Sequence, residues 1–289
     1  MEKIEVSAIF GPTASGKSDL AMEIALKNNG EIVSIDSIQI YKEMDIGSAK
    51  PDKKMQNDVK HHMIDIIEPN QKMDARSFAL LARAAIKDIA SRGKHPVLAG
   101  GSGLYFDALY YDFFDCPPSD PVFRDMMNKK WEIDEGESLH KKLESIDPVS
   151  ASRINKKNKP RLVRALEVFE LTGRTFSSTD NSKKRVDWLK TVNSIYVNPD
   201  RNILYDRINT RTEKMMQSGW FSEVNYLLVK YGASAKGMGA VGYKEVSEYL
   251  SVTRGHGLSE ADLVKIIQQN TRRLAKRQIT WFSKYGNYF

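Results

Sequence analysis

The sequence predicts an α/β fold in which a parallel sheet is flanked by helices and interrupted by a helical insertion. An apolar segment near the N-terminus leads into a glycine-rich loop and then a helical pattern, and strand and helix patterns alternate to about residue 103. From about residue 119, helix-forming residues dominate until an apolar segment returns. We therefore predict a core domain of residues 1–118 and 191–289 around an inserted helical domain of residues 119–190.

Each core element follows from its own residues. β-Branched and apolar side chains in "KIEVSAIF" (3–10) and "EIVSI" (31–35) predict two buried strands, and "HPVLAGG" (95–101) predicts a third. Apolar residues at helical spacing predict a helix that includes residues 20–25, directly behind the first strand. A longer apolar stripe predicts a second helix over residues 76–91.

The insertion and the C-terminal part read mainly as helices. Prolines are favoured in the first turn of a helix, so we expect helices of the insertion to begin at Pro121, Pro148 and Pro160. The segment "VNSIYVNPDR" predicts a return to the sheet as a further strand. Helical patterns then continue at 201–219, 222–231 and 261–285.

Composition sets the broad class of the protein. Of its 289 residues, 41% are hydrophobic and 28% charged, as in globular proteins with a sizeable core. The chain has no apolar run of the roughly 18 residues that a membrane helix needs, and "MEKIEVSAIF" lacks the apolar stretch of a signal peptide. The single cysteine, Cys116, excludes an intrachain disulfide and a cysteine-rich zinc module. We therefore expect a cytoplasmic protein without membrane contact, in its simplest state a monomer.

Basic residues are concentrated in two segments. The net charge is +7, and residues 151–166 and 263–289 each contain six basic residues and no acidic one. Such segments favour a polyanionic partner, because neutralising phosphates dominates the affinity of proteins for nucleic acids. Two solvated helix faces would give the same pattern, so charge alone leaves both interpretations open.

An octapeptide after the first strand predicts a phosphate site. The segment "GPTASGKS" (11–18) matches the phosphate-binding loop pattern, and it lies between a predicted strand and a predicted helix, as that pattern requires. Its backbone N–H groups can surround a phosphate, Lys17 can supply a charge, and the hydroxyl of Ser18 can bind Mg²⁺. The predicted binding residues are Gly11, Pro12, Thr13, Ala14, Ser15, Gly16, Lys17 and Ser18.

The residues themselves leave open the role of the carboxylate that accompanies this loop. A nucleoside triphosphatase usually has a Mg²⁺-binding aspartate at the end of an apolar strand, but "HPVLA" ends in Gly100. Asp36 ends the strand "EIVSI" and should face the loop, because the carboxyl ends of parallel strands line the ligand crevice. It could bind metal, act as a general base or cap a turn. His61 and His62 are adjacent, so on a strand they face opposite ways, and we expect structural roles over zinc binding.

Longer motifs then identify a family. The chain contains "DSIQIYKEMDIGSAKP", "HHMID", "GGSGLY", "DPVSASRI", "RLVRALEVFELTGR", "GAVGYKE" and "RQITWF" in this order. Together they closely resemble the bacterial-type tRNA dimethylallyltransferases, the isopentenyl-diphosphate:tRNA transferases, over nearly the whole chain. The resemblance implies a P-loop NTPase-like core with an inserted tRNA-binding domain. It also implies transfer of a dimethylallyl group from dimethylallyl diphosphate to the exocyclic amine of the adenosine 3′ of the anticodon, in tRNAs reading codons that begin with U.

The resemblance also assigns catalytic roles. Asp36 matches the general base of the family, and Ser102 stands where the family usually has threonine, whose hydroxyl can bond the reacting amine. Lys17, the loop N–H groups, Mg²⁺ on Ser18 and Arg211 would stabilise the departing diphosphate. Ser48 and Val241 replace the commoner Thr and Ile, which are mild departures.

For the tRNA, the resemblance implies a flipped-out adenine and contacts along the chain. Gln39 would pair with a purine edge, whereas for Trp281 packing in the core is favoured over stacking on a base. The family positions that match tRNA contacts are Asp36, Ser37, Ile38, Gln39, Ser102, Arg124, Pro160, Arg161, Leu162, Val163, Arg164, Gly242, Tyr243, Lys244, Lys276, Arg277, Gln278 and Trp281.

Two other functions fit parts of the sequence. A P-loop kinase or ATPase for a small metabolite would explain the loop and Asp36, but it leaves the basic insertion unexplained. A non-catalytic RNA-binding protein with a vestigial loop would explain the basic segments and predicts that Lys17 is dispensable.

Overall fold

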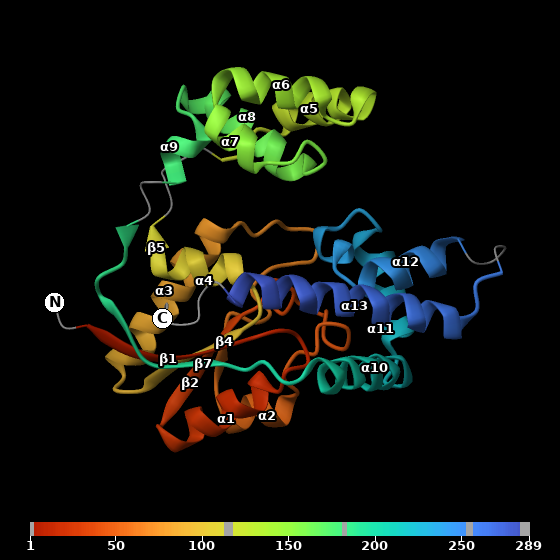
Figure 1. Cartoon of the computed structure of the whole chain (residues 1–289). Helices are drawn as coiled ribbons and strands as arrows, with labels where there is room; N and C mark the ends of the chain where they lie inside the picture. Colours follow the sequence, from red (N-terminus) through yellow and green to blue (C-terminus); the bar gives the residue numbers. More distant parts are fainter. Residues whose placement is uncertain (1–2, 113–117, 181–183, 253–256, 284–289) are drawn as a thin grey trace. The chain divides into compact units, whose positions relative to one another are not determined.

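A computed structural model describes residues 3–112, 118–180, 184–252 and 257–283 (Figure 1). The chain forms two compact units: the first contains Met1–Tyr110 and Asp187–Phe289, and the second contains Tyr111–Val186. The predicted insertion was 119–190, so the second unit begins eight residues earlier and ends four residues earlier than predicted. It ends earlier because residues 189–190 already belong to a sheet strand of the first unit. Cys116 and the predicted helix end at Tyr285 lie outside the described residues.

A five-stranded parallel sheet forms the centre of the first unit (Figure 1). The strand order is β3-β2-β4-β1-β7, so β1 pairs with β4 on one side and with β7 on the other. The three N-terminal strands predicted from the sequence and the returning strand are confirmed. The strands are β1 (Ile4–Phe10), β2 (Gly30–Ile35), β3 (His61–His62), β4 (His95–Gly100) and β7 (Leu189–Tyr196).

Helices cover both faces of this sheet (Figure 1). On one face α1 packs its buried Ala21 and Ala25 against apolar side chains of β1, β2 and β4. On the other face α3 buries an apolar stripe against β2 and β4 and also contacts α4. These helices are α1 (Lys17–Lys27), α2 (Lys53–Asp58), α3 (Ala75–Ser91) and α4 (Gly103–Tyr110).

Four C-terminal helices complete the first unit beyond the carboxyl ends of the strands (Figure 1). The longest, α13, packs on α10 and returns to contact α4 beside the sheet. Helices were predicted for three of these segments, whereas the segment after "GAVG" was not predicted to be helical. The four are α10 (Arg201–Gln217), α11 (Trp220–Tyr231), α12 (Tyr243–Val252) and α13 (Glu260–Phe282).

The second unit is a small helical domain with its own core. Its strands β5 and β6 pair antiparallel where the chain enters and leaves the unit. Pro121, Pro148 and Pro160 each lie in the first turn of a helix, as predicted. The elements are β5 (Tyr111–Asp112), α5 (Pro121–Asp134), α6 (Glu137–Ile146), α7 (Pro148–Arg153), α8 (Lys159–Thr172), α9 (Phe176–Asp180) and β6 (Lys184–Arg185).

A buried glutamate joins two helices of this domain. Glu167 on α8 is fully buried and accepts hydrogen bonds from Arg124 Nε at 2.8 Å, Arg124 Nη2 at 2.7 Å and Arg164 Nη1 at 2.5 Å. It also accepts from the backbone N–H of Asp120, at the start of α5. Burial alone would raise the pKa of Glu167, but the hydrogen bonds from the two arginines outweigh it and leave the pKa below its usual range.

Replacing Glu167 by alanine should therefore destabilise the protein. Removal of the buried carboxylate leaves two arginines unpaired. Because these arginines are partly exposed, we expect the free energy of unfolding in urea to fall by about 2–3 kcal/mol at pH 7. The pKa of Glu167 is lowered in the folded state, so its contribution is full above the unfolded value of about 4.3 and is lost as the pH falls through the folded value. The difference between parent and variant should thus shrink below about pH 4.

Glu170→Ala on the exposed surface of the same helix is the matched control and should change the stability by less than about 0.5 kcal/mol. Equal losses for the two variants at pH 7 would contradict the proposed pairing.

Candidate active site

The phosphate loop connects β1 to α1 as the sequence predicts. At Gly11 the loop backbone passes so close to β7 that a Cβ atom would lie 2.2 Å from the carbonyl oxygen of Val197, so only glycine fits there. The loop ends at Gly16, directly before α1. The predicted residues thus lie together at the carboxyl end of β1: Gly11 to Gly16 form the loop, and Lys17 and Ser18 begin α1.

Two cations are held against this loop by bonds to neutral groups. Lys17 donates from Nζ to the carbonyl oxygen of Pro12 at 3.2 Å, and Arg211 on α10 donates from Nη2 to Thr13 Oγ1 at 2.6 Å. Burial lowers the pKa of Lys17 to about 8; the carboxylate of Asp36 opposes this and the charge of Arg211 adds to it. Burial likewise lowers the pKa of Arg211. The loop therefore carries desolvated positive charge suited to an anionic ligand.

Asp36 and Ser102 lie at the ends of neighbouring strands and are joined through the backbone. Asp36 Oδ1 accepts hydrogen bonds from the N–H groups of Ile38 at 2.8 Å and Gln39 at 3.3 Å, so it does cap a turn. Ser102 Oγ accepts from the N–H of Ser37 at 3.0 Å, which leaves its own O–H to donate elsewhere. The capping role uses one carboxylate oxygen of Asp36, and the other oxygen does not serve these two bonds.

These groups line one cavity of about 520 Å³. Lys17, Arg211 and Asp36 contribute charged groups, and Ser102, Thr13 and Gln278 are among its polar residues. The rest of its wall includes the apolar side chains of Met215, Trp220, Val241, Ile267, Leu274 and Trp281. An adjoining hollow of about 60 Å³ is lined by Ser18, Ser34 and Asp36 among others. The cavity can therefore hold an anion and an apolar group side by side.

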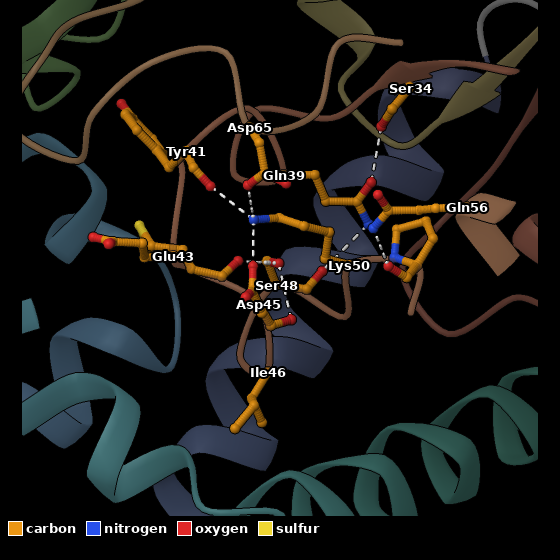
Figure 2. A network of polar contacts seen from close by, with 12 residues as sticks. Ser34, Gln39, Tyr41, Glu43, Asp45, Ile46, Ser48, Lys50, Gln56 and Asp65 are labelled. Carbon is orange, nitrogen blue, oxygen red and sulfur yellow. Dashed lines mark hydrogen bonds and ion pairs between the residues drawn. The ribbon is translucent and has the colours of Figure 1, made fainter. Parts of the chain in front are cut away.

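The segment from Asp36 to Pro51 is folded around two polar side chains, those of Gln39 and Lys50 (Figure 2). Gln39 accepts from Ser34 Oγ at 2.8 Å and donates to the carbonyl oxygens of Ser48 and Ala49. To read a purine edge, as the sequence predicts, Gln39 would have to exchange one of these bonds.

Lys50 is the second of these residues, and its side chain is only 2% exposed. It contacts the carbonyl oxygen of Tyr41 at 2.8 Å and the carboxylates of Asp45 and Asp65 at 2.5 Å and 2.6 Å (Figure 2). All three ammonium donors are thereby used within the segment.

Residues far along the chain brace the same segment. Glu223 on α11 accepts from the N–H groups of Asp45 at 2.9 Å, Ile46 at 2.7 Å and Gly47 at 3.3 Å, and from the hydroxyl of Tyr243 at 2.6 Å. This glutamate could not be predicted from the sequence, because no local pattern distinguishes it from an exposed helix charge.

Trp220 was missed as well, although glycines gave a signal. Its indole fills the space beside Gly47 and Gly242, where a Cβ atom would come within 2.2 Å of the ring. Gly47 and Gly242 lie in the motifs "DIGSAKP" and "GAVGYKE". The Trp220 ring explains why both positions are glycine. Trp220 also lines the cavity.

In the helical unit, the predicted tRNA residues fall into three groups. Pro160 and Arg161 are exposed. Leu162 and Val163 lie in the hydrophobic core of the unit, because they occupy the inner face of α8, so their side chains are packing residues and do not face a ligand. Arg124 and Arg164 bind Glu167, as described above.

In the sheet unit, Lys244, Lys276 and Arg277 are exposed. Gly242 and Tyr243 are buried against Trp220 and Glu223, which is a correction to their assignment as direct RNA contacts. Of the C-terminal basic segment, the structure describes residues 263–283.

Gln278 and Trp281 on α13 face the turn between β4 and α4. Gln278 binds the backbone of Thr13 and Gly101, and Trp281 lies beside Gly103, where a Cβ atom would be 2.2 Å from its ring. Trp281 is partly buried and lines the cavity, so it packs against the turn as favoured and also faces the site.

The two histidines form structural hydrogen bonds. His61 Nδ1 contacts the carbonyl oxygen of Val59 at 2.8 Å, and His62 Nε2 contacts the buried carboxylate of Glu31 at 2.7 Å. Within the described residues, no group of three or more His, Cys, Asp or Glu side chains is placed to hold a metal ion. In those same parts of the chain, no helix combines the length and apolarity needed to cross a membrane.

Comparisons with known proteins show the family of the chain. The family described as IPP transferase matches residues 39–285. A tRNA dimethylallyltransferase 1 from Citrifermentans bemidjiense is 42% identical over 289 residues, covering 100% of this chain and 92% of its own. A tRNA dimethylallyltransferase from Fervidobacterium nodosum is 43% identical, covering 96% of this chain and 88% of its own.

Solved structures show the same relationship. A tRNA isopentenylpyrophosphate transferase from Staphylococcus epidermidis superposes with a TM-score of 0.68 at 36% identity, covering 99% of this chain and 92% of its own. A eukaryotic dimethylallyltransferase acting on tRNA gives a TM-score of 0.81 at 25% identity, covering 97% of this chain and 70% of its own. The chain therefore belongs to the IPP transferase family, together with these tRNA dimethylallyltransferases.

Proposed function

We propose that this protein is a tRNA dimethylallyltransferase. It transfers the dimethylallyl group of dimethylallyl diphosphate to the exocyclic amine of the adenosine 3′ of the anticodon, in tRNAs that read codons beginning with U, and it releases diphosphate. One observation carries the proposal: the cations Lys17 and Arg211 line the same cavity as Asp36, Ser102 and a set of apolar side chains. An allylic diphosphate has one anionic and one apolar part, and such a cavity provides for both.

The cation side of the cavity assists departure of the diphosphate. As the allylic C–O bond breaks, negative charge grows on the bridging oxygen, and Lys17 and Arg211 are already desolvated beside the loop. Electrostatic groups that are placed before the reaction need no reorganisation when charge develops. Because Thr13 holds Arg211 through its hydroxyl, the arginine is directed along the loop.

A second pair of groups in the cavity, Asp36 and Ser102, activates the amine. The exocyclic amine of adenine is a weak nucleophile, because its lone pair is delocalised into the ring. We assign the removal of its proton, as the C–N bond forms, to Asp36. We assign a hydrogen bond with the same amine to the hydroxyl of Ser102. The adenine must leave the anticodon stack to enter the cavity, so the enzyme flips its target base.

The donor set fits Mg²⁺ as a cofactor. Mg²⁺ commonly takes only one or two protein oxygens and completes its coordination with water and phosphate oxygens. The hydroxyl of Ser18 and the carboxylate of Asp36 line the same small hollow next to Lys17, and they are oxygen donors of this kind. The bound ion would neutralise charge on the diphosphate.

The direct test combines the protein with Mg²⁺, dimethylallyl diphosphate and unmodified tRNA, followed by mass spectrometry of the nucleosides. We expect an adenosine that is heavier by one five-carbon group, and an anticodon stem-loop alone should also react. Release of phosphate from ATP without prenylated adenosine would instead support the kinase or ATPase function. We place the reaction in the cytoplasm and expect a monomer as the simplest state.

Asp36→Asn should lower the single-turnover rate by about 100-fold, because the amide cannot accept the amine proton. The asparagine keeps the oxygen that caps the turn through Ile38 N–H, so the local fold and tRNA binding should be retained. Rapid-quench measurements at saturating tRNA check the rate, and an unchanged rate would exclude Asp36 as the base.

The affinity for inorganic pyrophosphate should fall as the pH rises from about 7 to about 9. The pKa of Lys17 is lowered to about 8, so the ammonium group loses its proton in this range and its attraction for the anion with it. Lys17→Met serves as the control for the titration of pyrophosphate itself and should bind weakly, with a flatter pH dependence in calorimetry. Parallel curves for parent and variant would show that Lys17 does not bind the anion.

Arg161→Ala should weaken tRNA binding and lower the salt dependence of log Kd by about one unit, because one exposed phosphate contact is lost. Lys129→Ala removes an exposed charge of the same unit that is paired with Asp125 and lies outside the basic segment, and it is the matched control. Filter binding over a series of salt concentrations distinguishes them, and equal slopes for Arg161→Ala and the parent would count against a phosphate contact.

A further inference from the structure

The side-chain amide of Gln278 joins two catalytic segments that are far apart in the sequence. Its Oε1 accepts from the backbone N–H of Thr13 at 2.8 Å, and its Nε2 donates to the carbonyl oxygen of Gly101 at 3.0 Å. The orientation of the amide is determined by its partners, since one is a donor and the other an acceptor. The fit is close, because a Cβ atom at Gly101 would lie 2.5 Å from Nε2.

Each partner of Gln278 leads directly to a group of the reaction. Thr13 belongs to the phosphate loop, and its hydroxyl holds Arg211. Gly101 precedes Ser102, whose hydroxyl oxygen accepts from the N–H of Ser37 beside Asp36. Hydrogen bonds and short backbone links therefore connect Arg211 through Thr13, Gln278 and Gly101 to Ser102.

The backbones of the two segments also meet at this point. A Cβ atom at Gly101 would be 3.2 Å from the carbonyl oxygen of Gly11, the first residue of the phosphate loop. A change in the position of the amide would thus alter the separation between the loop and the turn that carries Ser102. Gln278 itself comes from α13, which gives it an anchor outside both segments.

We propose that Gln278 is a positioning residue that sets the distance between the leaving diphosphate and the attacking amine. This proposal rests on the proposed function and replaces the assignment of Gln278 as a tRNA contact. Displacement reactions depend steeply on the approach of the two reacting atoms, and a misplacement of about 1 Å can lower the rate by about 100-fold. Gln278 lines the cavity, and it contributes to the rate in this way through its bonds to Thr13 and Gly101.

Three variants test the proposal. Gln278→Met keeps the length of the side chain and removes both hydrogen bonds, and Gln278→Asn keeps the amide but shortens its reach. The matched control is Gln268→Met on the same helix, because Gln268 is buried and donates to the carbonyl oxygen of Asn209 and to Glu213. Circular dichroism and thermal unfolding compare the folded state of all three with that of the parent.

Three quantities are measured for each folded variant: the single-turnover prenylation rate with both substrates saturating, the Kd for tRNA, and the Kd for pyrophosphate with Mg²⁺. For Gln278→Met we expect a rate about 100-fold lower, and for Gln278→Asn a rate at least about 10-fold lower. The Kd for tRNA should change by less than about twofold in both, and Gln268→Met should react like the parent.

A parental rate in Gln278→Met or Gln278→Asn, measured in a parent protein that does prenylate tRNA, would overturn the positioning role. A large loss of tRNA affinity with an unchanged saturated rate would return Gln278 to the RNA contacts. An inactive parent would instead overturn the proposed function.

Discussion

The site depends on two desolvated cations, Lys17 and Arg211, which neutral oxygen atoms hold against the phosphate loop. Lys17 bonds a carbonyl and Arg211 a hydroxyl, and neither bond neutralises the charge. Desolvation of this kind is unfavourable for the free protein and becomes favourable when an anion enters. The loop is therefore shaped for a ligand, and the placement of α10, α13 and the 36–51 segment serves to hold it in that state.

Much of the rigidity around the cavity comes from residues that do not react. Gln39 and Lys50 fold the 36–51 segment on itself (Figure 2). Glu223 on α11 accepts hydrogen bonds from the backbone of the same segment. Sites that keep reactive groups close to their productive geometry need supporting contacts of this sort. The same logic applies to Glu167, which uses two arginines of the basic insertion for its own folding.

The sequence predicted what local patterns determine and missed what long-range contacts determine. The parallel strands, the phosphate loop and the proline-started helices follow from periodicity and turn chemistry within short windows. The bond from Gln278 to Thr13 spans 265 positions, and nothing near either residue indicates the other. The motif match assigned Leu162 and Val163 to the tRNA contacts, and only the packing of α8 shows that their side chains face a hydrophobic core.

The central claim is that the phosphate loop binds the diphosphate of an allylic substrate while Asp36 and Ser102 face its carbon end. A crystal structure of the protein with Mg²⁺ and dimethylallyl thiolodiphosphate, which reacts slowly, tests it most directly. The account predicts the diphosphate between Lys17 and Arg211, with the five-carbon group in the cavity on the side of Asp36. A diphosphate bound away from Lys17, or a five-carbon group directed out of the cavity, would contradict it.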